Sequence, residues 1–439
     1  MRLRCLCFFL LCASLCVSGG EACAAQKFDM EQAVLHALKS NPSVESASLA
    51  AEAAEAGRKA ARSAFGPSVS ASYEFDRFNK DRPSRSERNA ASLTVRLSQP
   101  LFTGWQLLNE YQKARLQEEY QQIRLASQRL STALQVQQAF LSHVKAQESI
   151  RSGKRRLERA RNQLAMAKTA WEIGLKPRLD MLQAEVEVSR AETALIRYEN
   201  ERDVFHDRLN SLLDIQPGAD AEYLGRLDIH PFRRTLEDCL AKTLEWCPNL
   251  LLARKSAEIA AADLGIAKSQ FWPKVSAVLG WTTSGSHIGA DGGKYAKKDY
   301  SYAHVGLAIN WTLFTSGQRL HLTRQAQRQV AAMEAAVRTA VNESAYTVRS
   351  CLFSAQDAYR TVKVAEKSVS SSRESYADAK MRYEVQSGTY LELLTAQSAL
   401  SEAELAEISA RAECLLSLAR LYEAMGELHP GLREGKTIP

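Results

Sequence analysis

The sequence has few of the residues and motifs that are typical of disulfide-rich domains, fibrous proteins or enzymes. Its 439 residues hold only nine cysteines, 21 glycines and 11 prolines, which excludes a disulfide scaffold and a collagen-like chain. It contains no Cys-x-x-Cys, no His-x-x-x-His and no nucleophile elbow, so neither a zinc site nor a catalytic serine is predicted. The net charge of +7, from 57 basic and 50 acidic residues, is small and spread along the chain. We therefore expect no enzyme activity, no metal or other cofactor and no nucleic-acid partner.

Long hydrophobic runs are also scarce, apart from one at the N-terminus. Residues 1–24 have the pattern of a secretory signal peptide, with Arg2 and Arg4 before an apolar stretch and Ala22-Cys23-Ala24 as the cleavage site. The stretch is shorter than the roughly 20 apolar residues of a membrane span, and a retained anchor is the alternative. No other segment has the length and apolarity of a transmembrane helix, so entry into a membrane is expected only as β-strands.

The remaining chain is a duplication. Pro42 corresponds to Pro248, and residues 63–71 correspond to 269–277, both 206 residues further on. At a spacing of 212 residues, Leu101-Phe102-Thr103 corresponds to Leu313-Phe314-Thr315. Matches in one order at separate places indicate a tandem repeat of long units. We predict a first repeat over 25–225, a second over 226–430 and a C-terminal tail over 431–439.

In each repeat the hydrophobic period changes from helical to two at the same point. Alternating apolar and polar residues predict strands at about 67–78 and 91–101, and again at about 273–283 and 300–311. We expect the four strands to pair as two hairpins through polar loops, with helices in the rest of both repeats. Half-buried strands of a soluble sandwich are the alternative.

Proline is missing from two long stretches, 101–176 and 274–429. About 65 helical residues span roughly 100 Å, which is too long for a globular core. Apolar and small residues recur there at coiled-coil spacing. Turns at 174–177 and 386–388 interrupt the two stretches, so each repeat is predicted as helix, hairpin, long helix, turn and helix. The fold class is therefore mainly α.

Four strands cannot close a barrel on their own. In hydrocarbon, the unpaired groups of an open sheet edge cost several kcal/mol each. Copies of the chain must therefore close the sheet: two copies give eight strands with a filled interior, whereas three give a twelve-stranded β-barrel with a lumen. Aromatic residues at the junctions of strand and helix are expected to form one girdle at the periplasmic membrane interface. These residues are Phe65, Phe102, Trp105, Phe271, Trp272, Trp311 and Phe314.

The chain resembles the TolC family of outer-membrane efflux and secretion proteins, the outer membrane factors. The resemblance covers about residues 28–428 and rests on motifs that recur in order in both repeats: Asn41-Pro42, Phe65-Gly66-Pro67-Ser68, Gln99-Pro100-Leu101-Phe102-Thr103-Gly104 and Trp171-x-x-Gly174. It implies a homotrimer, with a twelve-stranded barrel in the outer membrane of a Gram-negative bacterium and an α-helical barrel through the periplasm. It also implies two partners, a periplasmic adaptor (membrane fusion protein) and an inner-membrane RND or ABC transporter.

The resemblance further implies a gate at the periplasmic tip. Asp180 and Tyr383 match positions of a hydrogen-bonded tether between helices, and Glu392 matches an acidic constriction ring. Converging carboxylates in a narrow opening attract cations and impede anions. From the residues alone, Asp180 and Glu392 are equally well explained as carboxylates that begin helices, and Tyr383 as a packing residue.

Two functions from different classes remain. The first is a passive conduit of a tripartite efflux or type I secretion system. The second is a non-transporting structural or adhesive coiled-coil protein of the envelope. The hairpins favour the conduit, because an adhesin is expected to carry one barrel-forming segment at a terminus. A periplasmic adaptor needs no lipid-facing strands. The sequence does not indicate whether drugs, metals or polypeptides are transported.

Overall fold

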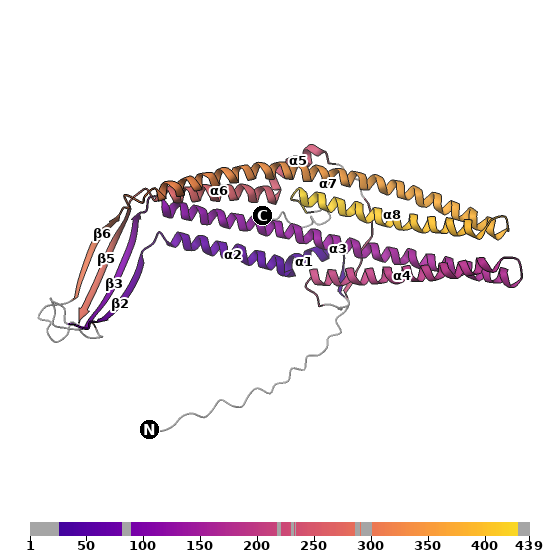
Figure 1. Ribbon diagram of the computed structural model, residues 1–439, viewed down its shortest axis with the longest axis horizontal. Helices are drawn as coiled ribbons and strands as arrows, with labels where there is room; N and C mark the ends of the chain where they lie inside the picture. The colour runs from indigo at the N-terminus through magenta and orange to yellow at the C-terminus, as the bar shows by residue number, and fades with distance from the viewer. Residues whose placement is uncertain are drawn as a thin grey trace, which may run out of the picture.

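The computed structural model describes residues 26–80, 89–216, 221–229, 232, 234–285, 290 and 301–428. The predicted signal peptide, the tail at 431–439 and most of both loops between paired strands lie outside these residues. The described chain is a rod of long helices that carries a four-stranded sheet at one end (Figure 1). No helix in these ranges combines the length and apolar composition needed to cross a membrane.

The predicted tandem duplication is confirmed by helices of equal length in the two repeats. The first repeat contains α1 (Met30–Ser40), α2 (Pro42–Ser63), α3 (Gln106–Glu172) and α4 (Arg178–Leu212). The second contains α5 (Leu236–Trp246), α6 (Pro248–Ser269), α7 (Gln318–Glu384) and α8 (Tyr390–Ala424). In each repeat these helices have 11, 22, 67 and 35 residues, in that order. A helix of 67 residues is about 100 Å long.

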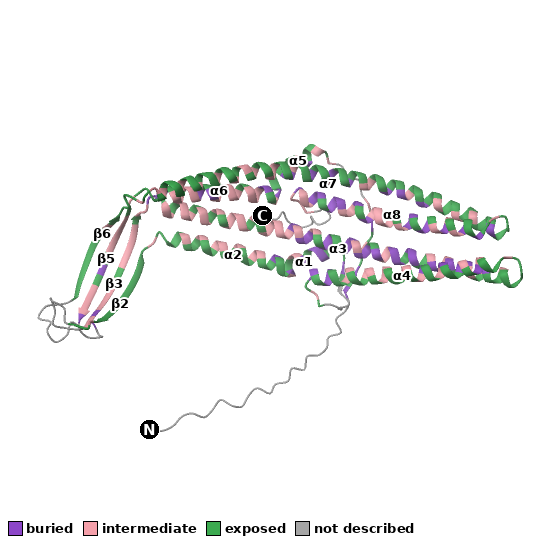
Figure 2. Cartoon of the chain, in the orientation of Figure 1, coloured by how far each residue is buried: buried purple, intermediate pink, exposed green. Residues whose placement is uncertain are grey.

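The helices form a single curved layer. Near the sheet, α2 and α6 lie on either side of α3, and α7 lies beyond α6 (Figure 1). In the other half of the rod, α4 and α8 take the places of α2 and α6. Buried residues concentrate near the middle of the rod (Figure 2), where Val136, Phe140 and Leu209 form a core. A layer one helix thick cannot bury both of its faces, which explains why most of α7 is exposed.

The sheet joins the two hairpins in the order β2-β3-β5-β6, with all neighbours antiparallel. Its strands overlap the four alternating segments of the sequence: β2 (Ser68–Arg77), β3 (Asn89–Phe102), β5 (Lys274–Gly285) and β6 (Ser301–Asn310). Directly opposite residues share a face of a sheet, so the register Ala71↔Val95↔Trp281 extends one apolar face across both hairpins. On the other face Thr94 and Thr282 are hydrogen-bonded at 3.2 Å.

Pro100 lies in the inner strand β3, where proline normally interrupts a ladder. The pairing of β3 with β5 shifts register between Pro100 and Phe102. The missing N–H of proline therefore coincides with an irregularity of the ladder.

One small sheet differs from the expectation that everything outside the four strands is helical. Strands β1 (Gln26–Phe28) and β4 (Ala221–Tyr223) pair in parallel. The expectation was wrong here because three residues are too few to show an alternation. Phe28 and Tyr223 are buried and stacked with ring centroids 5.9 Å apart. The pair thereby attaches the N-terminal strand to the core at the middle of the rod.

Two turns at the far end of the rod reverse the chain between α3 and α4 and between α7 and α8. Gly174 has φ +78° after α3, and the corresponding residue after α7 is Gln386, with φ 63°. After α7, the N–H groups of Ser387 and Gly388 donate to the Arg382 carbonyl at 2.9 and 3.0 Å. A side chain in this left-handed conformation costs about 1 kcal/mol relative to glycine.

We expect Gln386→Gly to stabilise this turn by about 1 kcal/mol, because glycine adopts the left-handed conformation without a clash. The amide hydrogens of Ser387 and Gly388 should then exchange about fivefold more slowly, as measured by hydrogen exchange with mass spectrometry. Gly174→Gln is the matched control and should accelerate exchange at the first turn. Unchanged or faster exchange in Gln386→Gly would contradict the strain assigned to this residue.

Candidate functional site

The two turns lie side by side at the tip of the rod farthest from the sheet (Figure 1). Tyr383 is in the last turn of α7, and Asp180 is in the first turn of α4. The Tyr383 hydroxyl donates a hydrogen bond to Asp180 Oδ2 at 3.3 Å. Because α4 belongs to the first repeat and α7 to the second, this bond joins the two coiled coils at their ends.

The Tyr383 ring is held in a small apolar cluster. It is buried with Ala167, Ala184 and Leu393, and it meets Tyr390 edge to face at 5.6 Å. Burial first, and the Asp180 carboxylate second, raise the pKa of Tyr383 to about 12. The phenol therefore remains a protonated donor at neutral pH.

Asp180 has two roles that the sequence presented as alternatives. The residue before α4 is Pro177, which provides no side-chain cap, and Asp180 is the acidic residue of the first turn. A carboxylate there interacts favourably with the free N–H groups of the helix end. The same side chain accepts the hydrogen bond from Tyr383. The two roles are compatible because a carboxylate has several acceptor sites.

Glu392 occupies the third position of α8 in a capping box. Its backbone N–H donates to Thr389 Oγ1 at 3.2 Å, and its Oε2 accepts from the Thr389 N–H at 3.3 Å. Within the described residues it makes no hydrogen bond to Asp180 or Tyr383, although it lies in the same end of the rod. The carboxylate is exposed and one helix turn from the tip.

Behind the tip, buried polar contacts connect the repeats at positions that the sequence analysis missed. Ser152 on α3 donates to Glu404 on α8 at 2.8 Å, and Glu404 is 8% exposed. Gln163 on α3 donates to the Tyr376 hydroxyl on α7 at 3.3 Å. Polar residues at seam positions of a coiled coil are the signal for such contacts. The periodicity of the sequence indicates only the apolar members of the seam.

A buried ion pair lies within the first coiled coil. Arg156 on α3 contacts Glu187 on α4 at 2.7 Å, and Glu187 is 2% exposed. Removal of one partner from such a pair would leave an uncompensated charge, which is strongly destabilising.

At the opposite end, the structure gathers aromatic residues where the helices meet the sheet. Trp105 lies between Phe102 and Trp272, with ring centroids 5.1 and 5.3 Å away. The Trp311 indole donates to the Phe271 carbonyl at 3.2 Å. Gly104 is required there, since an added Cβ would lie 2.6 Å from the Trp272 Cβ. Phe65 is exposed and packs on Tyr111, and Phe314 is 82% exposed.

The described residues bring together no group of three histidine, cysteine, aspartate or glutamate side chains that could hold a metal ion. The contacts at the tip are a hydrogen bond, a cap and apolar packing. Such contacts can hold helices together or release them.

Comparisons with known proteins identify the family of this chain. The family model described as outer membrane efflux protein matches residues 34–213 and 240–427, which is most of both repeats. The outer membrane efflux protein BepC of Brucella suis is 23% identical, over 96% of this chain and 91% of that protein. The outer membrane protein TolC of Vibrio cholerae is 24% identical, over 89% of each chain.

Among solved structures, the outer membrane protein VceC of Vibrio cholerae superposes with a TM-score of 0.79 at 16% sequence identity. The match covers 91% of this chain and 96% of that one, so the two share a fold over nearly their whole length. Because the family model covers most of both repeats, the chain belongs to the outer membrane efflux protein family, and it is an outer-membrane channel for efflux or secretion rather than an enzyme.

Proposed function

We propose that three copies of this chain form a passive conduit across the outer membrane and the periplasm. The observation that carries the proposal is the four-stranded sheet, whose outer strands β2 and β6 each pair on one side only in the described chain. Its apolar face is uncovered, with Val305 82% and Leu307 68% exposed. Twelve strands from three copies would pair both edges and turn this face to lipid.

The other face of the sheet suits a wet lumen. Ser70, Arg96 and His304 lie in one row across it, together with Gly280. Eight strands would leave an interior filled by side chains, whereas twelve leave an open channel. In this arrangement the aromatic residues at the junction of sheet and helices lie at the periplasmic interface.

The helical layer also supports closure by neighbouring copies. Its two outer helices in the tip half, α4 and α7, carry large apolar side chains that are exposed in one chain. On α4 these include Leu182, Val186, Ile196 and Val204, and on α7 they include Tyr346, Phe353, Val364 and Met381. If α4 of one copy packs on α7 of the next, the three layers form a tube that continues the barrel.

The hydrogen bond between Asp180 and Tyr383 supports a gate at the end of this tube. While it is made, α7 and α8 stay close to α3 and α4 at the tip, and its loss lets them separate. In such a system a periplasmic adaptor docks at the tip, and an RND or ABC transporter in the inner membrane supplies the energy. The conduit itself needs only to open and close.

Removal of the tether should open the tip. We expect Asp180→Ala combined with Tyr383→Phe to raise the single-channel conductance of the unheated oligomer in a planar bilayer. A hydrogen bond to a carboxylate contributes about 1.5 kcal/mol, so its loss favours the open state by roughly tenfold.

The control is Asp357→Ala with Tyr359→Phe, a pair of the same residue types on α7 away from the tip. It should conduct like the unmodified chain. Equal conductance in both double variants would refute the gate. The absence of conductance from a folded oligomer in every form would refute the conduit and leave a structural coiled-coil protein.

Glu392 is proposed as the acidic ring of the closed tip. Glu392→Gln should lower the preference for cations, measured as the reversal potential in a salt gradient, because three carboxylates leave the opening. Glutamine also completes a capping box, so α8 should keep its thermal stability. Glu374→Gln, an exposed glutamate on α7, is the control. An unchanged reversal potential in Glu392→Gln would rule out the ring.

A further inference from the structure

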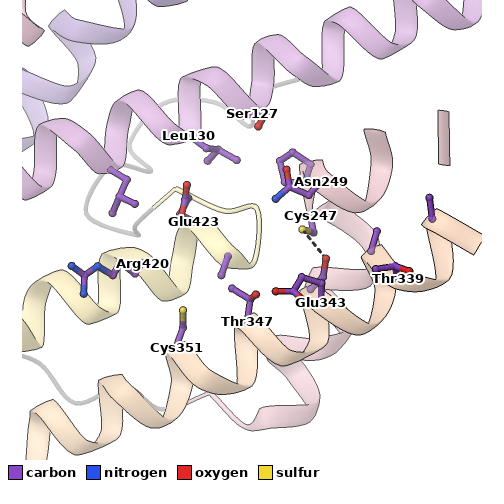
Figure 3. Close-up of a pocket in the computed structure, with 16 residues that line it drawn as sticks. Ser127, Leu130, Cys247, Asn249, Thr339, Glu343, Thr347, Cys351, Arg420 and Glu423 are labelled. Carbon is purple, nitrogen blue, oxygen red and sulfur yellow. Dashed lines mark hydrogen bonds between the residues drawn. The ribbon is translucent and has the colours of Figure 1, made fainter. Parts of the chain in front are cut away.

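A cavity of about 720 Å³ lies between α3 and α7, at the level where α8 ends and α6 begins (Figure 3). Its walls come from these four helices of one chain, so no neighbouring copy is needed to form it. Pockets of this size accept drug-sized molecules. Cys351 on its wall precedes Tyr383 by 32 residues of α7, or about 48 Å, so the cavity is remote from the tip.

The two repeats differ at this junction. In the first repeat, Asn41 Nδ2 donates to the Leu212 carbonyl at the end of α4 at 2.8 Å, and its Oδ1 accepts from the Ser43 N–H at 2.9 Å. This one side chain bridges the end of α4 and caps the start of α2. The corresponding residue of the second repeat is Cys247, which provides no side-chain cap for α6. Its thiol lies 3.6 Å from the Ser344 hydroxyl, on the cavity wall.

Two carboxylates line the cavity without a cationic partner. Glu343 comes from α7 and Glu423 from the last turn of α8, and neither has an ion pair within the described residues. The third charged residue, Arg420, is paired with Glu413 at 3.1 Å, and in Figure 3 its guanidinium points away from Glu423. The net charge facing the cavity is therefore negative.

Glu423 is partly buried, whereas Glu343 is exposed. In Figure 3 it projects into the space between α8 and Leu130 of α3. Burial raises the pKa of Glu423, and its position near the C-terminus of α8 is unfavourable for a negative charge. A bound cation would offset both effects, since a partly desolvated charge is stabilised by an opposite one.

The rest of the lining is mainly apolar, with Leu130, Leu134, Pro248, Ala336, Ala340 and Ala424. We propose that this cavity binds an organic cation, one positive charge on a body of aromatic or branched aliphatic groups. The apolar walls contact the aromatic or aliphatic groups of the cation, and the carboxylates of Glu423 and Glu343 interact with its positive charge. The bound cation then connects the end of α8 to α6 and α7, as Asn41 connects α4 to α2 in the first repeat.

Calorimetry on the unheated protein in phosphatidylcholine nanodiscs tests the proposal, with empty nanodiscs subtracted. The probe is methyltriphenylphosphonium, and the control is triphenylphosphine oxide, a neutral molecule with the same aryl groups. We expect saturable binding of one phosphonium per chain, at least tenfold tighter than that of the oxide. Glu423→Gln should weaken it about tenfold, whereas Glu402→Gln, exposed on α8 outside the cavity, should not.

A second readout needs no substitution. Saturating phosphonium should slow the alkylation of Cys351 by N-ethylmaleimide, followed by mass spectrometry, because this half-buried thiol lies on the cavity wall. The buried thiols of Cys239 and Cys414 lie outside the cavity and should react at unchanged rates.

Equal affinity for cation and oxide, equal affinity in the two glutamate variants, or an unchanged rate at Cys351 would each overturn the proposal. These results are independent of conductance. Binding of the cation by a chain that does not conduct would support the site and refute the conduit. Conductance by a chain that does not bind the cation would support the conduit and refute the site.

Discussion

Backbone hydrogen bonding at the edges of a sheet is the constraint on which the rest of this structure depends. Strands β2 and β6 each have one edge that no described strand of the chain pairs, and the sheet between them has one apolar face. In water such edges promote association, and in a membrane they are too costly to leave open. A sheet of only four strands must therefore associate through these edges. The helices of the two repeats, which are equal in length, then extend from each hairpin into the rod.

The duplication is regular in length and irregular in chemistry. Corresponding helices of the two repeats have the same number of residues, yet residue types differ at key positions. Asn41 corresponds to Cys247, and Gly174 corresponds to Gln386. Contacts between the repeats on the tip side of the rod combine polar pairs, Asp180 with Tyr383 and Ser152 with Glu404, with the apolar cluster around Tyr383. The polar pairs can separate at lower cost than the apolar contacts, because water replaces their hydrogen bonds. In the proposed gate, loss of the polar pairs would let the tip open while the coiled coils remain intact.

Much of the fold was predictable because its signals are long and repeated. Stretches without proline and strands with strict alternation give strong periodic patterns, and the duplication presents each pattern twice. The pairing of β3 with β5 was not predicted, since it depends on how two distant hairpins meet. Strands β1 and β4 were missed because each has three residues.

The candidate site was less predictable than the fold. Asp180 and Tyr383 were linked by family resemblance, since a tyrosine at a seam and an aspartate at a helix start do not indicate each other across 203 residues. The contact between Glu404 and Ser152 was not predicted, because a sequence does not indicate whether a polar residue at a seam position has a partner. The cavity at the second junction depends on side-chain packing around the ends of two helices, which periodicity does not describe.

Native mass spectrometry of the protein extracted unheated from the outer membrane tests the central claim most directly. The account predicts a mass of three processed chains. It also predicts that cysteines placed in β2 and β6 form disulfides only between different chains, because the two edges of one sheet lie too far apart. A single chain that remains folded in the membrane, or disulfides within one chain, would contradict closure of the sheet by association.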